Sequence, residues 1–141
     1  MKSIFNIFSI IIATVHNLTI LVFSSLKRHT FTYAVSNGRK MKGDLYLPFN
    51  VNHPLPLIIH LHGGGWNTGN RKDIQTGILR QVKRGYAVAS ISYSFAQHSK
   101  WPTQAEELKA AIRYLRANAK RFGIDGNCVF LWGVSAGGHI A

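Results

Sequence analysis

The sequence predicts an α/β domain with a mostly parallel sheet, an antiparallel hairpin at its start and helices on both faces. Three apolar runs, at 57–61, 86–91 and 128–134, contain no Lys, Arg, Asp or Glu. Such runs are typical of parallel strands that helices cover on both faces. Helical segments separate the runs, and this alternation is the order found in α/β domains. Because 141 residues supply only part of the elements that such a sheet needs, we expect a truncated domain.

The first elements expected are two antiparallel strands at Thr30–Val35 and Gly43–Leu47. Apolar and polar residues alternate along both, and the connection Ser36–Gly38 contains the Asn-Gly pair that favours a tight hairpin turn. Pro48–Pro56 has the composition of a linker. Leu55–Leu61 is then predicted as the first buried parallel strand.

Helices and strands alternate in the rest of the chain. Ile74–Arg84 is predicted as a helix that Gly85 closes, and Tyr86–Ser92 as the next strand. Thr103–Phe122 is the clearest helix, because its apolar residues recur three and four positions apart. These residues are Ala105, Leu108, Ile112, Leu115 and Ala119.

The ends of this long helix carry capping signals. Thr103 followed three residues later by Glu106 fits a capping box, and Gly123 fits a C-cap. Val129–Val134 is predicted as the next strand, and a further helix is expected to begin at Ala136.

Two motifs stand at the ends of predicted strands. Gly133–Gly137 reads GVSAG and fits G-x-S-x-G, a sharp turn that exposes a serine hydroxyl above a sheet edge. His62–Trp66 reads HGGGW and fits the loop whose backbone N–H groups form the other half of an oxyanion hole. Either motif alone is weak evidence. Both together, each after an apolar strand, indicate a serine hydrolase.

Ser135 is therefore the candidate nucleophile. A serine hydroxyl becomes reactive when a base removes its proton. The small residues Gly133 and Gly137 suit a crowded turn, because larger side chains would collide with neighbouring backbone. The N–H of Ala136 is expected to face the developing oxyanion, aided by the positive end of its helix. The alternative is an ordinary strand-to-helix turn that contains a serine.

From Leu57 onward the chain resembles the α/β-hydrolase family, and within it the hormone-sensitive-lipase-like and acetyl- or feruloyl-esterase-like carboxylesterases. The stretches that carry the resemblance are 58–66, 90–95, 101–102, 110–119 and 132–139. They correspond to the first half of such a domain. One departure is visible, because Ser92-Tyr93-Ser94 stands where the family often has Asp-Tyr-Arg.

The resemblance implies roles for the glycine loop. The N–H groups of Gly64 and Gly65 would complete the oxyanion hole, while His62 would brace the loop by hydrogen bonding. The alternative is a flexible glycine turn. The resemblance also implies a small-molecule ester as substrate, an acyl-enzyme on Ser135 and no cofactor. The triad Asp or Glu and His of this family follow the nucleophile, and we identify neither in this chain, which ends at Ala141.

The histidines near these motifs have simpler interpretations than catalysis or metal binding. His60 and His62 lie two residues apart, but a catalytic zinc site needs three protein ligands and no third is suitably spaced. No metal site is therefore expected. His139 lies one turn beyond Ser135 on a helix that runs away from the hydroxyl. We expect a packed helix residue there and not the catalytic base.

The remaining candidates are also assigned structural roles. Cys128 is expected to behave as a small apolar residue in a strand. Asp44, Asp73 and Asp125 show no arrangement that marks a triad acid, and Asp125 is expected in the turn before the last strand.

The formal net charge of +12 suggests a nucleic-acid or anionic-membrane partner. The basic residues, however, occur as pairs at separate element ends and form no continuous stripe. No recognised nucleic-acid-binding motif accompanies them. We therefore expect no nucleic-acid partner.

The N-terminal segment, residues 1–26, is distinct from the rest. Residues 3–26 contain no Lys, Arg, Asp or Glu and are long enough to cross a bilayer. The apolar run 4–15 fits a signal peptide, although an Ala-x-Ala cleavage site is missing. We expect a signal peptide or membrane anchor, and hence a membrane-associated or exported protein. The alternative is a helix packed on the domain of a cytoplasmic protein.

The sequence thus predicts that residues 30–141 form the N-terminal half of a serine carboxylesterase domain. The alternative is a truncated, non-catalytic remnant of such an enzyme.

Overall fold

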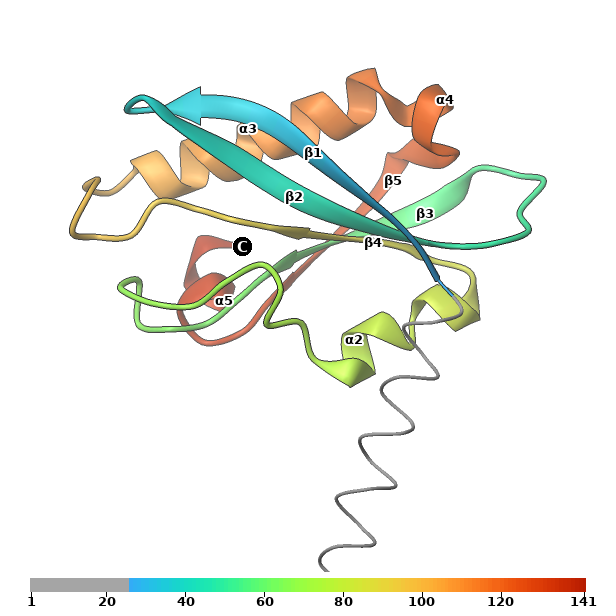
Figure 1. The fold of residues 1–141 in the computed structure, drawn as a ribbon, viewed down its shortest axis with the longest axis horizontal. Helices are drawn as coiled ribbons and strands as arrows, with labels where there is room; N and C mark the ends of the chain where they lie inside the picture. Colours follow the sequence, from blue (N-terminus) through green and yellow to red (C-terminus); the bar gives the residue numbers. More distant parts are fainter. Residues whose placement is uncertain (1–25) are drawn as a thin grey trace, which may run out of the picture.

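The computed structural model describes residues 26–141, which form one mixed sheet with helices on both faces (Figure 1). The five strands are β1 (Leu26–Ser36), β2 (Arg39–Pro48), β3 (Leu55–Leu61), β4 (Ala87–Ile91) and β5 (Ile124–Gly133). Their spatial order is β1-β2-β4-β3-β5. β1 and β2 are antiparallel to their neighbours, whereas β3 runs parallel to both β4 and β5. The predicted fold class is confirmed.

The helices divide between the two faces. The helical elements are α2 (Thr76–Leu79), the 3-10 helix η1 (Val82–Arg84), α3 (Thr103–Ala117), α4 (Ala119–Phe122) and α5 (Ala136–Ile140). One core cluster joins α3 and α5 to the sheet through Leu108, Leu115 and Ile140. The other joins α2 and η1 to the opposite face through Ile78 and Val82.

The hairpin confirms the turn expected from the sequence. β1 and β2 pair directly on either side of Asn37 and Gly38. Both turn residues have positive φ, 48° and 73°, as a type I′ turn requires. The strands extend beyond the predicted limits because their pairing continues to Leu26 and Pro48.

The helix predicted at Ile74–Arg84 is broken, and the prediction of one continuous helix was wrong. Gln75 has an extended backbone, with ψ 141°, so α2 begins only after it. The N–H of Lys83 bonds to the carbonyl of Arg80, three residues back, which tightens the second turn into η1. This tightening keeps Val82 in the same core as Ile78.

The long helix also differs from its prediction at both ends. It stops after Ala117 because the Asn118 side chain donates to the Tyr114 carbonyl, at 2.8 Å, and competes with the helical backbone bonds. The capping box was wrong, since Pro102 occupies the N-cap and no side chain caps the helix. The C-cap at Gly123 is confirmed by its left-handed backbone, with φ 66°.

The last strand is longer and more exposed than predicted. β5 begins at Ile124, which pairs with Leu55, so Asp125 lies in the strand and not in a turn before it. Within the described residues β5 pairs only with β3, at one edge of the sheet. As a result Phe130 and Trp132 remain 50% and 41% exposed. The expectation that the run 128–134 is buried on both faces is therefore wrong.

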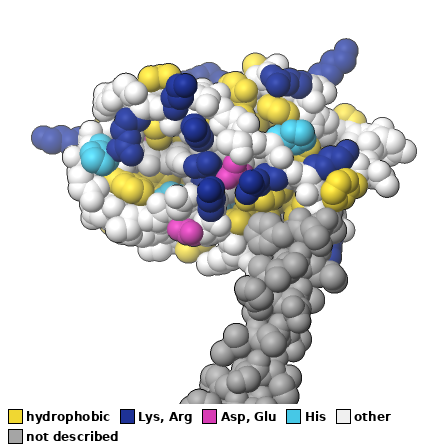
Figure 2. All heavy atoms as spheres, viewed as in Figure 1, with side chains coloured by type: hydrophobic (Ala, Val, Ile, Leu, Met, Phe, Trp, Pro, Cys, Tyr) yellow, Lys and Arg dark blue, Asp and Glu magenta, His cyan; other side chains and the backbone are white. Residues whose placement is uncertain are grey.

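Charge is spread over the surface in view. Figure 2 shows Lys and Arg side chains dispersed across this face with acidic side chains among them.

No helix within residues 26–141 is both long and apolar enough to span a membrane. The signal-peptide or anchor prediction for residues 3–26 falls almost entirely outside the described part of the chain.

Candidate active site

Ser135 occupies a sharp turn between β5 and α5. Its backbone angles, φ 51° and ψ −117°, are far from the regions that L-residues favour. Such a conformation costs on the order of 1–3 kcal/mol and persists only where the surroundings enforce it. The serine is exposed, whereas Ala136 directly after it is buried. The turn thus holds a strained, accessible hydroxyl at the carboxyl end of a parallel strand.

Two glycines of the serine motif, Gly133 and Gly137, lie so close to neighbouring backbone that a larger residue would not fit. A methyl group on Gly133 would lie 2.3 Å from the carbonyl oxygen of Gly137. A methyl group on Gly137 would lie 2.3 Å from the carbonyl oxygen of Leu61. Both distances are far shorter than van der Waals contact. α5 therefore packs directly against the end of β3, from which the glycine loop departs (Figure 1).

The glycine loop lies against the serine turn. A methyl group on Gly63 would be 3.1 Å from the Val134 carbonyl oxygen and 3.5 Å from Cβ of Ser135. Gly64 and Gly65 have positive φ, 123° and 57°, which a residue with a side chain rarely adopts. The structure therefore brings together the two motifs that are far apart in the sequence.

Three backbone donors beside the serine are unused. Among residues 26–141, the N–H groups of Gly64, Gly65 and Ala136 donate to no acceptor. The carbonyl oxygen of Gly64 is engaged instead, accepting from the N–H groups of Asn67 and Thr68 at 3.0 Å. The Gly64 carbonyl oxygen thus closes the loop, and the N–H groups of Gly64 and Gly65 stay available to bind a ligand.

His62 lies beneath the loop and is fixed on several sides. Its Nδ1 donates to the carbonyl oxygen of Gly63 at 2.7 Å, which assigns the ring proton to Nδ1. Its ring stacks on Tyr93 with centroids 4.4 Å apart, and the Tyr93 hydroxyl donates to the His62 carbonyl oxygen at 2.8 Å. Burial lowers the pKa of His62. The hydrogen bond to Gly63 and the charge of Asp73 raise it, but by less. The ring is therefore neutral near pH 7.

His60 faces a different environment. Its Nδ1 donates to Oγ of Ser90 at 2.9 Å, and this hydroxyl donates to the Arg71 carbonyl oxygen at 2.7 Å. Burial, with a smaller effect of His62, lowers the pKa of His60 to about 4. Across the described residues, no three His, Cys, Asp or Glu side chains gather as metal ligands. The two histidines are separate structural residues.

Within the described residues, none of the other sequence candidates has a hydrogen bond or ion pair with the Ser135 side chain. Asp44 is buried, where it pairs with Arg71, Oδ2 to Nε at 3.0 Å, and accepts from the Thr30 hydroxyl at 2.6 Å. Asp125 accepts from the N–H of Asn127. Cys128 is a free, half-buried thiol in β5.

His139 contacts aromatic rings. Its ring lies 5.4 Å from Trp66 and 5.2 Å from Trp101, between centroids. Among the described residues no histidine accepts a hydrogen bond from the Ser135 side chain. His139 lies in α5, as expected, and contacts two aromatic rings, but it is exposed and not packed in the interior.

Sequence reasoning missed one buried acid. Glu107 on α3 is 4% exposed and accepts from both the N–H and the hydroxyl of Ser94, at 2.7 and 2.6 Å. This arrangement holds the loop after β4 in place. The sequence did carry a signal for this buried acid. Of the pair Glu106-Glu107, only Glu107 falls on the buried stripe of the helix that contains Leu108 and Leu115.

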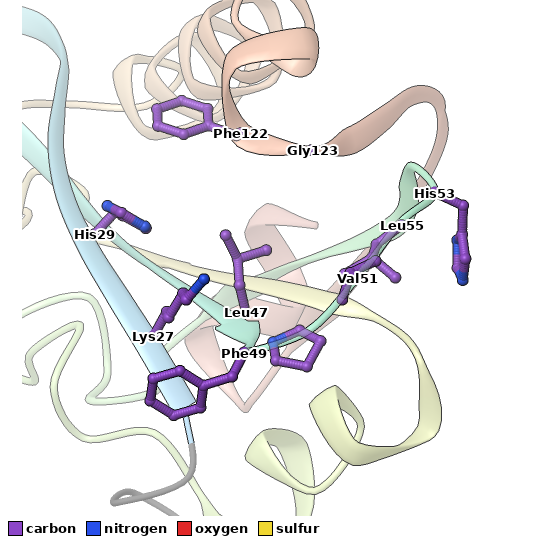
Figure 3. A pocket seen from close by; sticks show the side chains of 10 residues that line it. Lys27, His29, Leu47, Phe49, Val51, His53, Leu55, Phe122 and Gly123 are labelled. Atoms are coloured by element: carbon purple, nitrogen blue, oxygen red, sulfur yellow. The ribbon is translucent and has the colours of Figure 1, made fainter.

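A separate cavity lies at the opposite end of the sheet (Figure 3). It measures about 180 Å³ and is lined by residues such as Lys27, Phe49, Leu55 and Gly123. Leu55 and Gly123 lie at the amino ends of β3 and β5, whereas the serine follows the carboxyl end of β5. This cavity is therefore not part of the candidate active site.

Several curated esterases are similar in sequence to this chain. The curated relatives include Esterase LipC of Mycobacterium tuberculosis, 38% identical over 89 residues, which cover 62% of this chain and 22% of the relative. Another is an arylesterase of Saccharolobus solfataricus, 32% identical over 116 residues, which cover 75% of this chain and 38% of the relative. The chain thus spans well under half the length of these relatives.

Solved esterase structures have the same fold. A bacterial heroin esterase superposes with a TM-score of 0.76 at 26% identity, covering 91% of this chain and 43% of that one. Esterase 2 of Thermogutta terrifontis gives 0.74 at 25% identity, covering 80% and 42%. The BD-FAE family model matches residues 43–141, more than half of the chain and all of the motifs described above. On this match, the chain belongs to the BD-FAE family of α/β-hydrolases.

Proposed function

We propose that this chain carries the nucleophile and oxyanion hole of a serine carboxylesterase that acts on small-molecule esters. The observation that supports it best is the strained turn at Ser135, which lies against a glycine loop with unused N–H donors. The names of its relatives, esterase and arylesterase, support the same reaction.

The reaction has two steps. Oγ of Ser135 forms a bond to the ester carbonyl carbon, the bond to the alcohol oxygen breaks, and the proton of the serine hydroxyl is transferred to the departing alcohol. Water then cleaves the acyl-enzyme, which releases the acid and restores the hydroxyl. The N–H groups of Gly64, Gly65 and Ala136 stabilise the oxyanion of each tetrahedral intermediate. His62 braces the loop that presents two of these donors.

The alternative is a truncated, non-catalytic remnant, and one experiment separates the two. The chain is treated with a serine-directed fluorophosphonate, both alone and co-expressed with the C-terminal half of a close relative. The second condition is included because the relatives are much longer. Labelling and hydrolysis of p-nitrophenyl acetate that disappear in Ser135→Ala support the enzyme.

Two outcomes would contradict the proposal. Labelling that persists in Ser135→Ala would place the nucleophile elsewhere. A folded, complemented protein that is neither labelled nor active would favour the remnant.

A further inference from the structure

The cavity at the amino ends of β3 and β5 combines basic and apolar side chains. Lys27 and His29 extend from β1 toward Leu47, as Figure 3 shows, and His53 lies at the far side of the cavity. The rest of the lining is apolar side chains and Gly123, and no Asp or Glu is among the lining residues. A partner at this end therefore meets positive charge and apolar surface together.

The basic side chains at this end are not neutralised by acids. Within the described part of the chain, neither Lys27 nor Arg121 pairs with a carboxylate. Lys27 Nζ lies 5.8 Å from the centroid of the Phe49 ring, and Arg121 Cζ lies 5.5 Å from that of Phe122. Asp125 is close along the chain but does not line the cavity. The positive charge is thus available to an anionic partner.

Two large apolar side chains beside these charges are exposed to solvent. Phe49 is 50% exposed and Val51 is 39% exposed, and both lie between β2 and β3. Both also line the cavity that Lys27 lines. Exposed apolar side chains next to basic ones are typical of protein surfaces that bind anionic membranes. We call this region the amino-end surface, which consists of Lys27, His29, Phe49, Val51 and His53.

The amino-end surface lies where an uncharged stretch of the chain enters the domain. Residues 3–26 contain no Lys, Arg, Asp or Glu, and Lys27 follows them directly. Leu26, the first described residue, pairs with Pro48, the neighbour of Phe49 in the sequence. A stretch of this length without charges favours a lipid environment. A bilayer that takes up this stretch would meet the amino-end surface first.

The serine turn lies at the other end of the sheet. β5 begins directly after Gly123, which lines the cavity, and ends at Gly133, two residues before Ser135. Its 10 residues, at about 3.3 Å each, span about 30 Å. Figure 1 shows α4 and α5 at opposite ends of this strand. A bilayer in contact with the amino-end surface would therefore leave the serine turn facing water.

We propose that the amino-end surface docks on an anionic lipid bilayer. Phe49 and Val51 enter the boundary between headgroups and acyl chains, while Lys27 contacts the lipid phosphates. Docking itself does not depend on the reaction at Ser135. It rests on the proposed function only for its consequence, which is that the ester substrates reach Ser135 from water and not from the bilayer.

The test measures contact between the domain and lipid, because residues 3–26 can by themselves attach the full chain to a vesicle. Cys128→Ser removes the free thiol, and a fluorophore is then attached to a single new cysteine in Val51→Cys or Val35→Cys. Val35 is the matched control, since it is also an exposed valine but lies beside the hairpin turn and does not line the cavity. The vesicles contain phosphatidylcholine and phosphatidylserine, about three to one, with nitroxide quenchers on the acyl chains.

We expect the label at position 51 to be quenched and the label at position 35 to stay unquenched. On vesicles of phosphatidylcholine alone, quenching at position 51 should fall several-fold. Lys27→Gln should lower the ratio of docked to undocked domain about fivefold, because each basic side chain near an anionic bilayer contributes about that factor. Lys40→Gln is its control, since it changes the net charge equally but lies beside Val35 in the hairpin.

Four results would overturn docking: no binding to the anionic vesicles, no quenching at position 51 in bound chain, equal quenching at both positions, or equal effects of the two lysine variants. Fluorophosphonate labelling of Ser135 is measured on the same vesicles. Docking without labelling would retain the membrane surface and refute the nucleophile, whereas labelling without docking would do the reverse. Should Lys27→Gln fail to fold, the comparison of the two labelled valines still decides.

Discussion

Replacing Gly137 with Ala tests whether close packing of α5 on β3 places the oxyanion loop. The new methyl group would lie 2.3 Å from the Leu61 carbonyl oxygen and 2.6 Å from that of His62. Ordinary contact begins near 3.4 Å, so α5 and the end of β3 must separate by about 1 Å. Both contacted atoms belong to backbone, which cannot rotate away as a side chain would.

This displacement has two expected costs. Overpacking of a well-packed interior destabilises a protein by about 1–3 kcal/mol. A shift of about 1 Å between a nucleophile and the groups that position its substrate reduces the rate on the order of 100-fold. Gly137→Ala should therefore react with fluorophosphonate roughly 100-fold more slowly and unfold at a lower urea concentration.

Gly138→Ala is the matched control. Gly138 lies in the same helix, but a methyl group there would meet its nearest neighbour, the Gly133 carbonyl oxygen, at 3.4 Å. Alanine also favours a helix over glycine by up to about 1 kcal/mol. This variant should label within a few-fold of the original chain and be equally or more stable. Equal labelling rates and equal stabilities of the two variants would refute the packing argument.

Two further predictions concern buried ionisable side chains. Burial lowers the pKa of His60 from 6.5 to about 4. Between pH 6.5 and pH 4, His60 is therefore protonated in the unfolded chain but not in the folded one, so the free energy of unfolding should fall by about 3 kcal/mol as the pH decreases through this range. Urea unfolding at several pH values should show a shallower decline in His60→Gln, and an unchanged slope would contradict the assignment. Glu107→Gln should cost about 1–3 kcal/mol, because the two Ser94 donors bond to different carboxylate oxygens and the amide replaces one of these with an NH₂ group. The same change at exposed Glu106 should stay within about 0.5 kcal/mol. Equal urea midpoints for these two variants would show that the buried carboxylate is not needed.

The limits of elements were the least predictable part of the fold. Strand β3 and the cap at Gly123 follow from local patterns, so they were recovered from the sequence. The break at Asn118 arises from a side-chain hydrogen bond to Tyr114 that periodicity does not record. Likewise, β5 was predicted as buried because its composition is apolar, whereas its exposure depends on its place at the sheet edge.

The order of strands and helices and the two motifs around Ser135 could be predicted from local patterns, because spacing, glycine placement and turn chemistry act within a few residues. How distant segments meet is set by the folding of the whole domain. The parallel pairing of β3 with β5 places the glycine loop on the serine turn. Hydrogen bonds between loops bring Trp66 and Trp101 to one cavity with His139. These contacts depend on chain crossovers and packing distances, which no local pattern of residues encodes.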